Sequence, residues 1–185
     1  MRVAISGSHR TGKTTLVEEL AALLPNYATI DEPYHLMEEE GYAFCHPPSL
    51  EDYEAQLFRS IESLKERGRR VFFDRCPVDF LGYIAVHEDA DSFDWDERLP
   101  RIRVALQRLD LIVFVPVEAQ GRIAFSMSND DDGSRALVDD KLGEILLDDP
   151  FELGVEVLAV EGDPERRLRT VMESILRGRG RSRRR

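Results

Sequence analysis

The chain has 185 residues, of which 42% are hydrophobic, and it carries a formal net charge of −11. This length and apolar content suit one globular domain with its own core, and no second domain is needed. Six arginines lie in residues 177–185, so the rest of the chain carries about −17, which argues against a nucleic-acid partner. The longest apolar run, residues 111–117, is too short to span a bilayer.

The cysteine content and the first residues favour a cytoplasmic protein with no membrane partner. Cys45 and Cys76 are far apart and lack metal-ligand spacing, which favours a reducing compartment. Residues 1–5 lead directly into an apolar segment and leave no room for a signal peptide. The composition does not distinguish a monomer from a homodimer.

The strongest motif lies at residues 7–14, GSHRTGKT, and fits the P-loop pattern of glycine, four residues, then Gly-Lys-Ser/Thr. A short apolar run at residues 3–6 precedes it, as expected of a buried strand, and residues 15–24 are apolar at helical spacing. Strand, glycine loop and helix are the order that a phosphate-binding loop needs, which argues against a chance match.

The chemistry of this loop predicts a site for ATP and Mg²⁺. The glycines let the backbone approach phosphate oxygens, and the following helix directs amide groups and its positive end toward them. Lys13 is expected to reach the β- and γ-phosphates, and Thr14 to offer its hydroxyl to the metal ion. The predicted nucleotide-binding residues are Gly7, Ser8, His9, Arg10, Thr11, Gly12, Lys13, Thr14 and Thr15.

Charged residues follow the next two predicted strands. Residues 27–30 are typical of a short strand, with Glu32 just beyond it, and residues 70–73 are typical of a buried strand followed by Asp74 and Arg75. Open α/β sheets bind ligands beyond the carboxyl ends of their strands, so these three residues are site candidates. The alternatives are a solvated acidic turn around Glu32, and an Asp74 and Arg75 that merely neutralise each other at a helix start.

The remaining segments alternate helices and strands. We expect a capped helix from Ser49 to Gly68, an acidic loop at 87–96, a helix with Pro100 in its first turn, a strand at 111–115, an irregular loop at 116–132, a short helix around 138–146, a strand at 155–160 and a helix from Asp163. Five short strands alternating with helices predict an α/β fold with three layers, in which helices cover both faces of a mostly parallel sheet.

The polar loop at 116–132 is long for a compact domain, and such loops often form lids or binding loops. An arginine carried over the phosphates by a lid could stabilise charge during transfer, so Arg122 and Arg135 are catalytic candidates. The alternative for each is a solvated surface arginine, because this chain uses arginine throughout.

The end of the chain is predicted to lie outside the domain. Residues 178–185 have no apolar side chain, so we expect a disordered basic tail after a domain of residues 1–177. The functional alternative is an electrostatic contact with an acidic partner or a nucleic acid.

These motifs together resemble the P-loop nucleoside and nucleotide kinases, the group of deoxynucleoside kinases, thymidylate kinases and ribosylnicotinamide kinase-like ATPase domains. The resemblance covers nearly the whole domain. It consists of the P-loop at the start, Glu32-Pro33 after the second strand, Val71-Phe72-Phe73-Asp74-Arg75 after a helix ending at Gly68, and a last strand leading to Gly162-Asp163 and Glu165-Arg166-Arg167. The resemblance implies a P-loop NTPase fold with five strands in the order 2-3-1-4-5.

The resemblance also implies roles for single residues. Glu32 matches the carboxylate that accepts the proton of the substrate hydroxyl, Asp74 an acidic residue near magnesium, and Arg75 an arginine near the transferred group. Gln56 matches a position that reads the base in some relatives. The implied reaction is transfer of the ATP γ-phosphoryl group to a small nucleoside- or nucleotide-like acceptor. Cys76-Pro77 departs from the Ser or Tyr of these kinases, which puts the acceptor's identity in doubt.

Two other classes of P-loop protein compete with a kinase. An ATPase switch that hydrolyses ATP to regulate a protein partner is supported by Asp31-Glu32, which resembles the end of an ATPase's second nucleotide motif. A GTPase is disfavoured, because neither Lys65 nor Lys141 is followed two residues later by the aspartate of a guanine-reading motif. The kinase interpretation is the one we favour.

Overall fold

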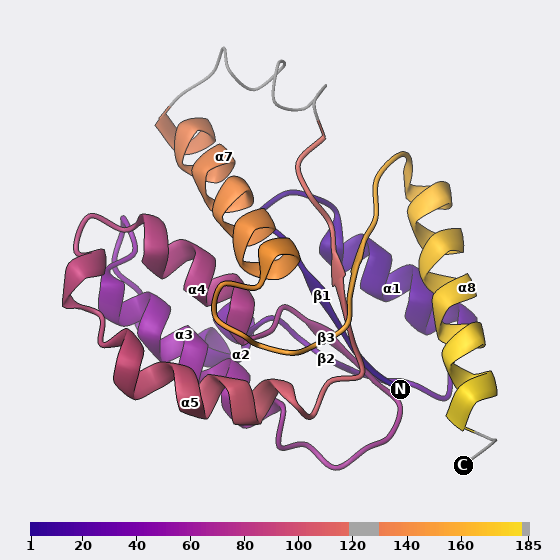
Figure 1. Cartoon of the computed structure of the whole chain (residues 1–185). Helices are drawn as coiled ribbons and strands as arrows, with labels where there is room; N and C mark the ends of the chain where they lie inside the picture. The colour runs from indigo at the N-terminus through magenta and orange to yellow at the C-terminus, as the bar shows by residue number, and fades with distance from the viewer. Residues whose placement is uncertain (119–129, 183–185) are drawn as a thin grey trace.

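The computed structural model of the chain describes residues 1–118 and 130–182 and contains a five-stranded parallel sheet (Figure 1). The strands lie in the order β2-β3-β1-β4-β5, which confirms the predicted fold class and strand order. Their bounds are β1 (Arg2–Ser6), β2 (Ala28–Ile30), β3 (Val71–Asp74), β4 (Leu111–Phe114) and β5 (Val157–Ala159). The three central strands are buried on both faces, which explains their continuous apolar runs.

Helices cover both faces of the sheet, with α1 and α8 on one side and α3, α4 and α5 on the other (Figure 1). Their bounds are α1 (Lys13–Leu23), α2 (Pro33–Glu39), α3 (Leu50–Ser63), α4 (Pro77–Val86), α5 (Trp95–Leu106), α7 (Asp130–Gly143) and α8 (Pro164–Ser182). Two shorter elements are the 3-10 helix η1 (Ala90–Ser92) and the π-helix η2 (Glu144–Asp148), which continues α7. Within the described residues, no helix is long and apolar enough to cross a membrane.

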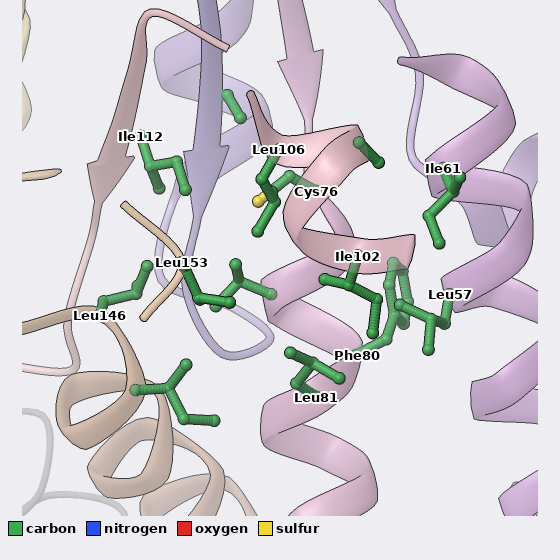
Figure 2. Packing of buried hydrophobic residues seen from close by; sticks show 14 of the residues in the cluster. Leu57, Ile61, Cys76, Phe80, Leu81, Ile102, Leu106, Ile112, Leu146 and Leu153 are labelled. Atoms are coloured by element: carbon green, nitrogen blue, oxygen red, sulfur yellow. The ribbon is translucent and has the colours of Figure 1, made fainter. Parts of the chain in front are cut away.

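The larger core cluster fills the space between the sheet and α3, α4, α5 and α7. Figure 2 shows Leu57 of α3 and Phe80 of α4 packed beside Ile102 of α5, and all three are almost completely buried. The smaller cluster lies under α1 and α8, where Leu20 and Ile175 have no exposed surface. The two clusters hold both helix layers against the sheet and so fix the loops that leave its carboxyl edge.

The sheet register brings separate segments of the chain to one edge. Ile5 pairs with Asp74 across β1 and β3, and Ile30 pairs with Phe73 across β2 and β3. Because all strands are parallel, their carboxyl ends lie along the same edge, as in other open α/β sheets. The glycine loop after β1, Glu32 after β2 and the end of β3 therefore lie side by side.

The start of α5 differs from the sequence prediction. Pro100 lies inside the helix rather than in its first turn, because α5 begins at Trp95 and is capped by the Asp94 side chain, which accepts from the Glu97 amide. The proline removes one backbone hydrogen bond. Burial of Ile102 and Leu106 offsets this cost, so the helix extends into the segment expected to be a loop.

Helix α2 had no assignment from the sequence, and the end of α8 differs from the prediction. Residues 33–39 lack clear periodicity, yet they form α2 with Pro33 in its first turn. The prediction of a disordered tail at residues 178–185 is corrected for residues 178–182, because α8 continues to Ser182. Arginine is a good helix former and each glycine costs only about 1 kcal/mol, so a helix already anchored on the core can continue through Gly178. Residues 183–185 lie outside the described part of the chain.

Candidate active site

The loop between β1 and α1 has two positions that require glycine. Gly7 has a φ of +151°, and a Cβ atom there would lie 2.4 Å from the backbone oxygen of Val115. Gly12 has a φ of +87° and directly precedes the first residue of α1. A side chain at either position would be strained, so the motif's glycines have a structural cause. The loop leads directly into the N-terminus of α1.

Lys13 is held inside this loop. Its side chain is buried, and its Nζ donates to the carbonyl oxygen of Ser8 at 2.6 Å. Burial, with a smaller contribution from the positive charge of Arg75, lowers the pKa of Lys13 to about 8. Thr11 donates its hydroxyl to the same carbonyl at 3.1 Å. A phosphate group in the loop would offer this ammonium a stronger partner than a single carbonyl does.

Other predicted nucleotide-binding residues are arranged around the loop in different environments. Ser8 is buried and His9 is half-buried, whereas Arg10, Thr14 and Thr15 are exposed. Arg10 adopts a left-handed conformation with a φ of +57°. Ser8, His9 and Arg10 lie in the turn between β1 and α1, and Thr14 and Thr15 lie in the first turn of α1.

Asp74 and Thr14 meet at the end of β3. The Thr14 hydroxyl donates to Oδ2 of Asp74 at 2.7 Å, and burial raises the pKa of the Asp74 carboxyl group. Oδ1 of Asp74 is buried and has no hydrogen-bond partner within the described residues. A hydroxyl beside an unsatisfied carboxylate oxygen fits Mg²⁺, which prefers oxygen ligands and retains water and phosphate ligands. In the described residues no group of three His, Cys, Asp or Glu side chains could hold a metal ion.

Arg75 and Glu32 form a partly buried ion pair next to the loop. Nε of Arg75 donates to Oε1 of Glu32 at 2.7 Å, and the two side chains are only 5% and 21% exposed. Burial acts to raise the pKa of Glu32, but the charges of Arg75 and Lys13 hold it below its usual value. Burial acts to lower the pKa of Arg75, but Tyr83, Glu32 and Asp79 raise it. Glu32 is therefore ionised at neutral pH.

Asp74 and Arg75 do not neutralise each other, contrary to the alternative considered from the sequence. Arg75 has a left-handed backbone with a φ of +73°, which directs its guanidinium away from its neighbour. Its Nη1 donates to the carbonyl of Gly7 at 3.0 Å, and its Nη2 lies 3.5 Å from the Tyr83 hydroxyl. The guanidinium thus lies between Glu32 and the glycine loop.

Asp79 is a residue of this site that sequence reasoning missed. Its side chain is fully buried, and it accepts hydrogen bonds from the backbone amides of Gly7 at 2.9 Å and Cys76 at 2.8 Å. Arg75 lies 3.4 Å from the same carboxylate. The sequence did contain one signal for Asp79. Cys76 is the N-cap of α4, and an aspartate three residues after the cap can complete a capping box.

Arg167 is a second residue whose contact with the loop was not predicted. From the first turns of α8, its Nη1 donates to the carbonyl of Thr11 at 2.7 Å, and its Nη2 donates to Glu118 at 2.8 Å. Glu118 also accepts from the amide of Gly162 at 2.6 Å. This network links the segments after β4 and β5 to the glycine loop.

The structure describes one of the two arginines that were expected on a lid. Arg135 of α7 is buried, and its Nη2 donates to the carbonyl of Arg10 at 3.2 Å, so the structure brings it to the loop. Arg122 falls outside the described residues. The first turns of α7 begin at Asp130, within the segment expected to be irregular.

Gln56 lies on α3 and is buried, and its Nε2 donates to the carbonyl of Asp52 at 3.2 Å. No hydrogen bond in the described part of the chain joins it to Glu32 or Arg75. The nearest link from its helix is Tyr53, whose ring stacks on Tyr83 with centroids 5.1 Å apart. Helix α3 is therefore linked to Arg75 through the stacked rings of Tyr53 and Tyr83, and not through Gln56.

The parallel sheet in this order, with a glycine loop between β1 and α1, has the P-loop nucleoside and nucleotide kinase-like fold. The sequence profile described as an AAA domain matches residues 2–167, so the chain belongs to that AAA domain family. No curated protein matches the sequence.

Solved structures share this fold at low sequence identity. Deoxyadenosine kinase from M. mycoides with bound dATP has a TM-score of 0.66 and 16% identity, covering 95% of this chain and 98% of the other. NadR protein in complex with NR has a TM-score of 0.65 and 20% identity, with 94% of this chain but only 48% of NadR covered. Shikimate kinase from Aquifex aeolicus vf5 has a TM-score of 0.58 and 17% identity, covering 97% and 98%. At these identities the similarity shows the fold.

Proposed function

We propose that this protein is a kinase that transfers the γ-phosphoryl group of Mg-ATP to a hydroxyl group of a small nucleoside- or nucleotide-like acceptor. The observation that carries the proposal is the partly buried Glu32–Arg75 pair, whose arginine also bonds to the first glycine of the P-loop. A carboxylate fixed this close to a phosphate-binding loop suits an acceptor hydroxyl. Two of the structurally similar proteins are named as kinases of small molecules, which agrees with this assignment.

In the proposed site the P-loop residues bind and orient the phosphates. The backbone amides of residues 8–14 and the N-terminus of α1 would face the phosphate oxygens, and Lys13 would exchange its contact with Ser8 for one with phosphate. Arg135 adds a positive charge beside Arg10, on the outer part of the loop. Such transfer passes through a loose transition state, so positioning and charge neutralisation supply most of the catalysis.

Thr14 and Asp74 are the residues that would hold Mg²⁺. A bound Mg²⁺ ion would neutralise charge on the β- and γ-phosphates. The unpaired Oδ1 of Asp74 is a suitable acceptor for the metal or for its water, and the Thr14 hydroxyl is already adjacent. The raised pKa of Asp74 falls again when a cation arrives, because an adjacent positive charge favours the ionised carboxylate.

Glu32 would orient the acceptor hydroxyl and take its proton. Its carboxylate stays ionised, because Arg75 and Lys13 lower its pKa, so it can accept a hydrogen bond from an alcohol. Arg75 already donates to Glu32, Gly7 and Asp79, which leaves little of its guanidinium for an acceptor phosphate. The arrangement therefore favours a hydroxyl group over a phosphate group as the nucleophile.

Transfer would be direct rather than through a cysteine intermediate. Cys76 follows Arg75 in the chain, but its thiol is buried, and burial together with the nearby Asp79 raises its pKa well above the ordinary value. A buried neutral thiol is a poor nucleophile.

A second candidate is an ATPase that hydrolyses ATP to regulate a protein partner. The AAA domain family assignment and the ionised Glu32, which could orient a water molecule as readily as an alcohol, are the observations that favour it. The two functions differ in the acceptor of the phosphoryl group, which is a small molecule for the kinase and water for the ATPase.

The test supplies ATP radiolabelled at the γ-phosphate, with Mg²⁺, to a panel of nucleosides, nucleotides and other small alcohols. A labelled phosphorylated acceptor that requires both Lys13 and Glu32 supports the kinase. Labelled inorganic phosphate alone, with every acceptor, supports the ATPase and overturns the kinase proposal. The matched controls are Lys13→Ala and Glu32→Gln, which separate nucleotide binding from acceptor activation.

A further inference from the structure

We infer that Asp79 is a positioning residue for the P-loop, which together with Arg75 holds both peptide groups of Gly7. The inference rests on the proposed function, because its consequence is the affinity of the loop for Mg-ATP. It assigns to the first turn of α4 a role beyond capping its own helix.

The contacts of Gly7 carry the inference. Its backbone amide donates to Oδ1 of Asp79 at 2.9 Å, and its carbonyl accepts from Nη1 of Arg75 at 3.0 Å. Asp79 and Arg75 are themselves 3.4 Å apart, so the two ends of one charged pair bond to the two sides of one glycine. The other oxygen of Asp79 accepts from the amide of Cys76 at 2.8 Å, which anchors the carboxylate to the N-terminus of α4.

The donors to this buried carboxylate show that it serves more than a helix end. Asp79 has no exposed surface, and burying a carboxylate is costly unless all of its lone pairs are well used. An ordinary cap is satisfied by a short polar side chain at the protein surface. Here the compensating donors come from the P-loop, from Arg75 and from the helix, so the loop and α4 are tied together.

A rotation of the Gly7 backbone would change the direction of the loop amides that follow it. The carbonyl of Val115 occupies the space beside its Cα, at 2.4 Å from an added Cβ, so the backbone has little room to rotate on that side. The orientation of the following peptide groups starts from this residue. If the Asp79 contact is lost, the loop amides are no longer held in one arrangement. The free energy of Mg-ATP binding then includes the cost of ordering them, so the affinity falls.

The chain contains a matched comparison in Asp52. It is also a buried carboxylate, 1% exposed, in a capping box, at the start of α3. Its partners are the amides of Ser49 and Cys45 and the Tyr42 hydroxyl, and none of them belongs to the P-loop. Both aspartates therefore stabilise a helix start, but only Asp79 contacts Gly7.

The experiment compares Asp79→Asn with Asp52→Asn. Each change keeps the shape of the side chain but turns an amide NH₂ group toward a backbone N–H, so both variants should unfold at a lower temperature than the wild type. We expect the affinity for Mg-ATP, titrated well below either midpoint, to fall about tenfold or more in Asp79→Asn and to stay within about twofold of wild type in Asp52→Asn. Wild-type affinity in Asp79→Asn, or an equal loss in both variants, overturns the inference.

Amide hydrogen exchange in the wild type provides a measurement that needs neither a folded variant nor ATP. The Gly7 amide should exchange as slowly as the core amides of β1, because its partner is a buried carboxylate. Rapid exchange at Gly7 overturns the inference even if Asp79→Asn fails to fold. Absence of Mg-ATP binding by the wild type, with a protected Gly7 amide, would instead count against the proposed function.

Discussion

Glu32 and Arg75, 43 residues apart in the chain, are joined by a hydrogen bond of 2.7 Å between Oε1 and Nε. They meet because β2 and β3 are adjacent and parallel, with Ile30 opposite Phe73, so the residues just beyond both strands lie at the same edge. The left-handed backbone of Arg75 then directs its guanidinium back across this edge. One arginine thereby contacts both the proposed acceptor base and the glycine loop.

Lys13→Ala should separate activity from stability. Turnover of Mg-ATP should fall about 10²-fold or more, because the loop loses its charge at the phosphates. The variant should be no less stable than the wild type at neutral pH. Burial lowers the pKa of Lys13 below its ordinary value of 10.5, so the unfolded state holds this proton more tightly. The resulting cost to folding is complete below about pH 8 and disappears as the pH rises to the ordinary value. Steady-state turnover and thermal unfolding measure the two effects, and unchanged turnover would contradict the P-loop assignment.

The affinity for Mg-ATP should decrease as pH rises above about 8. The pKa of Lys13 in the free protein is lowered to about 8, whereas bound phosphate favours the protonated ammonium. Binding therefore takes up a proton above that pH, and the dissociation constant should rise by up to about tenfold per pH unit. Titration calorimetry in buffers from about pH 7 to about pH 9.5 tests this, with Lys13→Ala as the control, whose weaker binding should not vary over this range.

Glu32→Gln and Asp74→Asn should affect different steps. Glu32→Gln keeps the shape of the side chain but removes the proton acceptor, so Mg-ATP affinity should change little while single-turnover transfer falls about 10²-fold or more. Asp74→Asn removes charge at the proposed metal site, so affinity should fall in Mg²⁺, with a much smaller change in its absence. Equal loss of Mg-ATP affinity in the two variants would refute this division of roles. A fully active Glu32→Gln would move the proton acceptor to Asp31 or favour the ATPase.

Gly7→Ala should destabilise the fold by about 2 kcal/mol or more, because its new methyl group would meet the Val115 backbone oxygen and the main chain must shift. Gly154→Ala is the control. Gly154 also has a positive φ of +67°, but no atom lies within 4 Å of an added Cβ, so the expected cost is only about 1 kcal/mol. Urea unfolding of both variants gives the comparison, and similar losses would show that conformation alone, rather than the close approach, requires glycine at Gly7.

Removal of residues 179–185 should leave turnover of Mg-ATP unchanged. Among the α8 side chains whose burial the structure describes, the last fully buried ones are Val171 and Ile175, and both precede the cut. We expect the free energy of unfolding to change by no more than about 0.5 kcal/mol. A large fall in turnover at low salt would instead show that the arginine-rich end acts electrostatically on the site. A chain lacking only residues 183–185 tests whether a partial loss of charge has the same effect.

The sequence by itself determined the fold class, the strand order implied by the family resemblance, and the position of the P-loop. The fold class and the position of the P-loop depend on local patterns, whereas the strand order came from the resemblance alone. Gly12 is required by its backbone conformation, and the apolar runs at β1 and β3 are required by burial on both faces. Such requirements act on neighbouring residues and can be inferred without knowing what packs against them.

Only the tertiary structure decided which charged groups pair. The sequence left open an Asp74 neutralised by Arg75, whereas in the fold Asp74 bonds to Thr14, and Arg75 bonds to Glu32 and Gly7. The role of Asp79 was missed for the same reason, because its partner amide lies 72 residues away. Pairing between distant charges depends on strand register, on one left-handed residue and on burial, and none of these is encoded in the spacing of the residues along the chain.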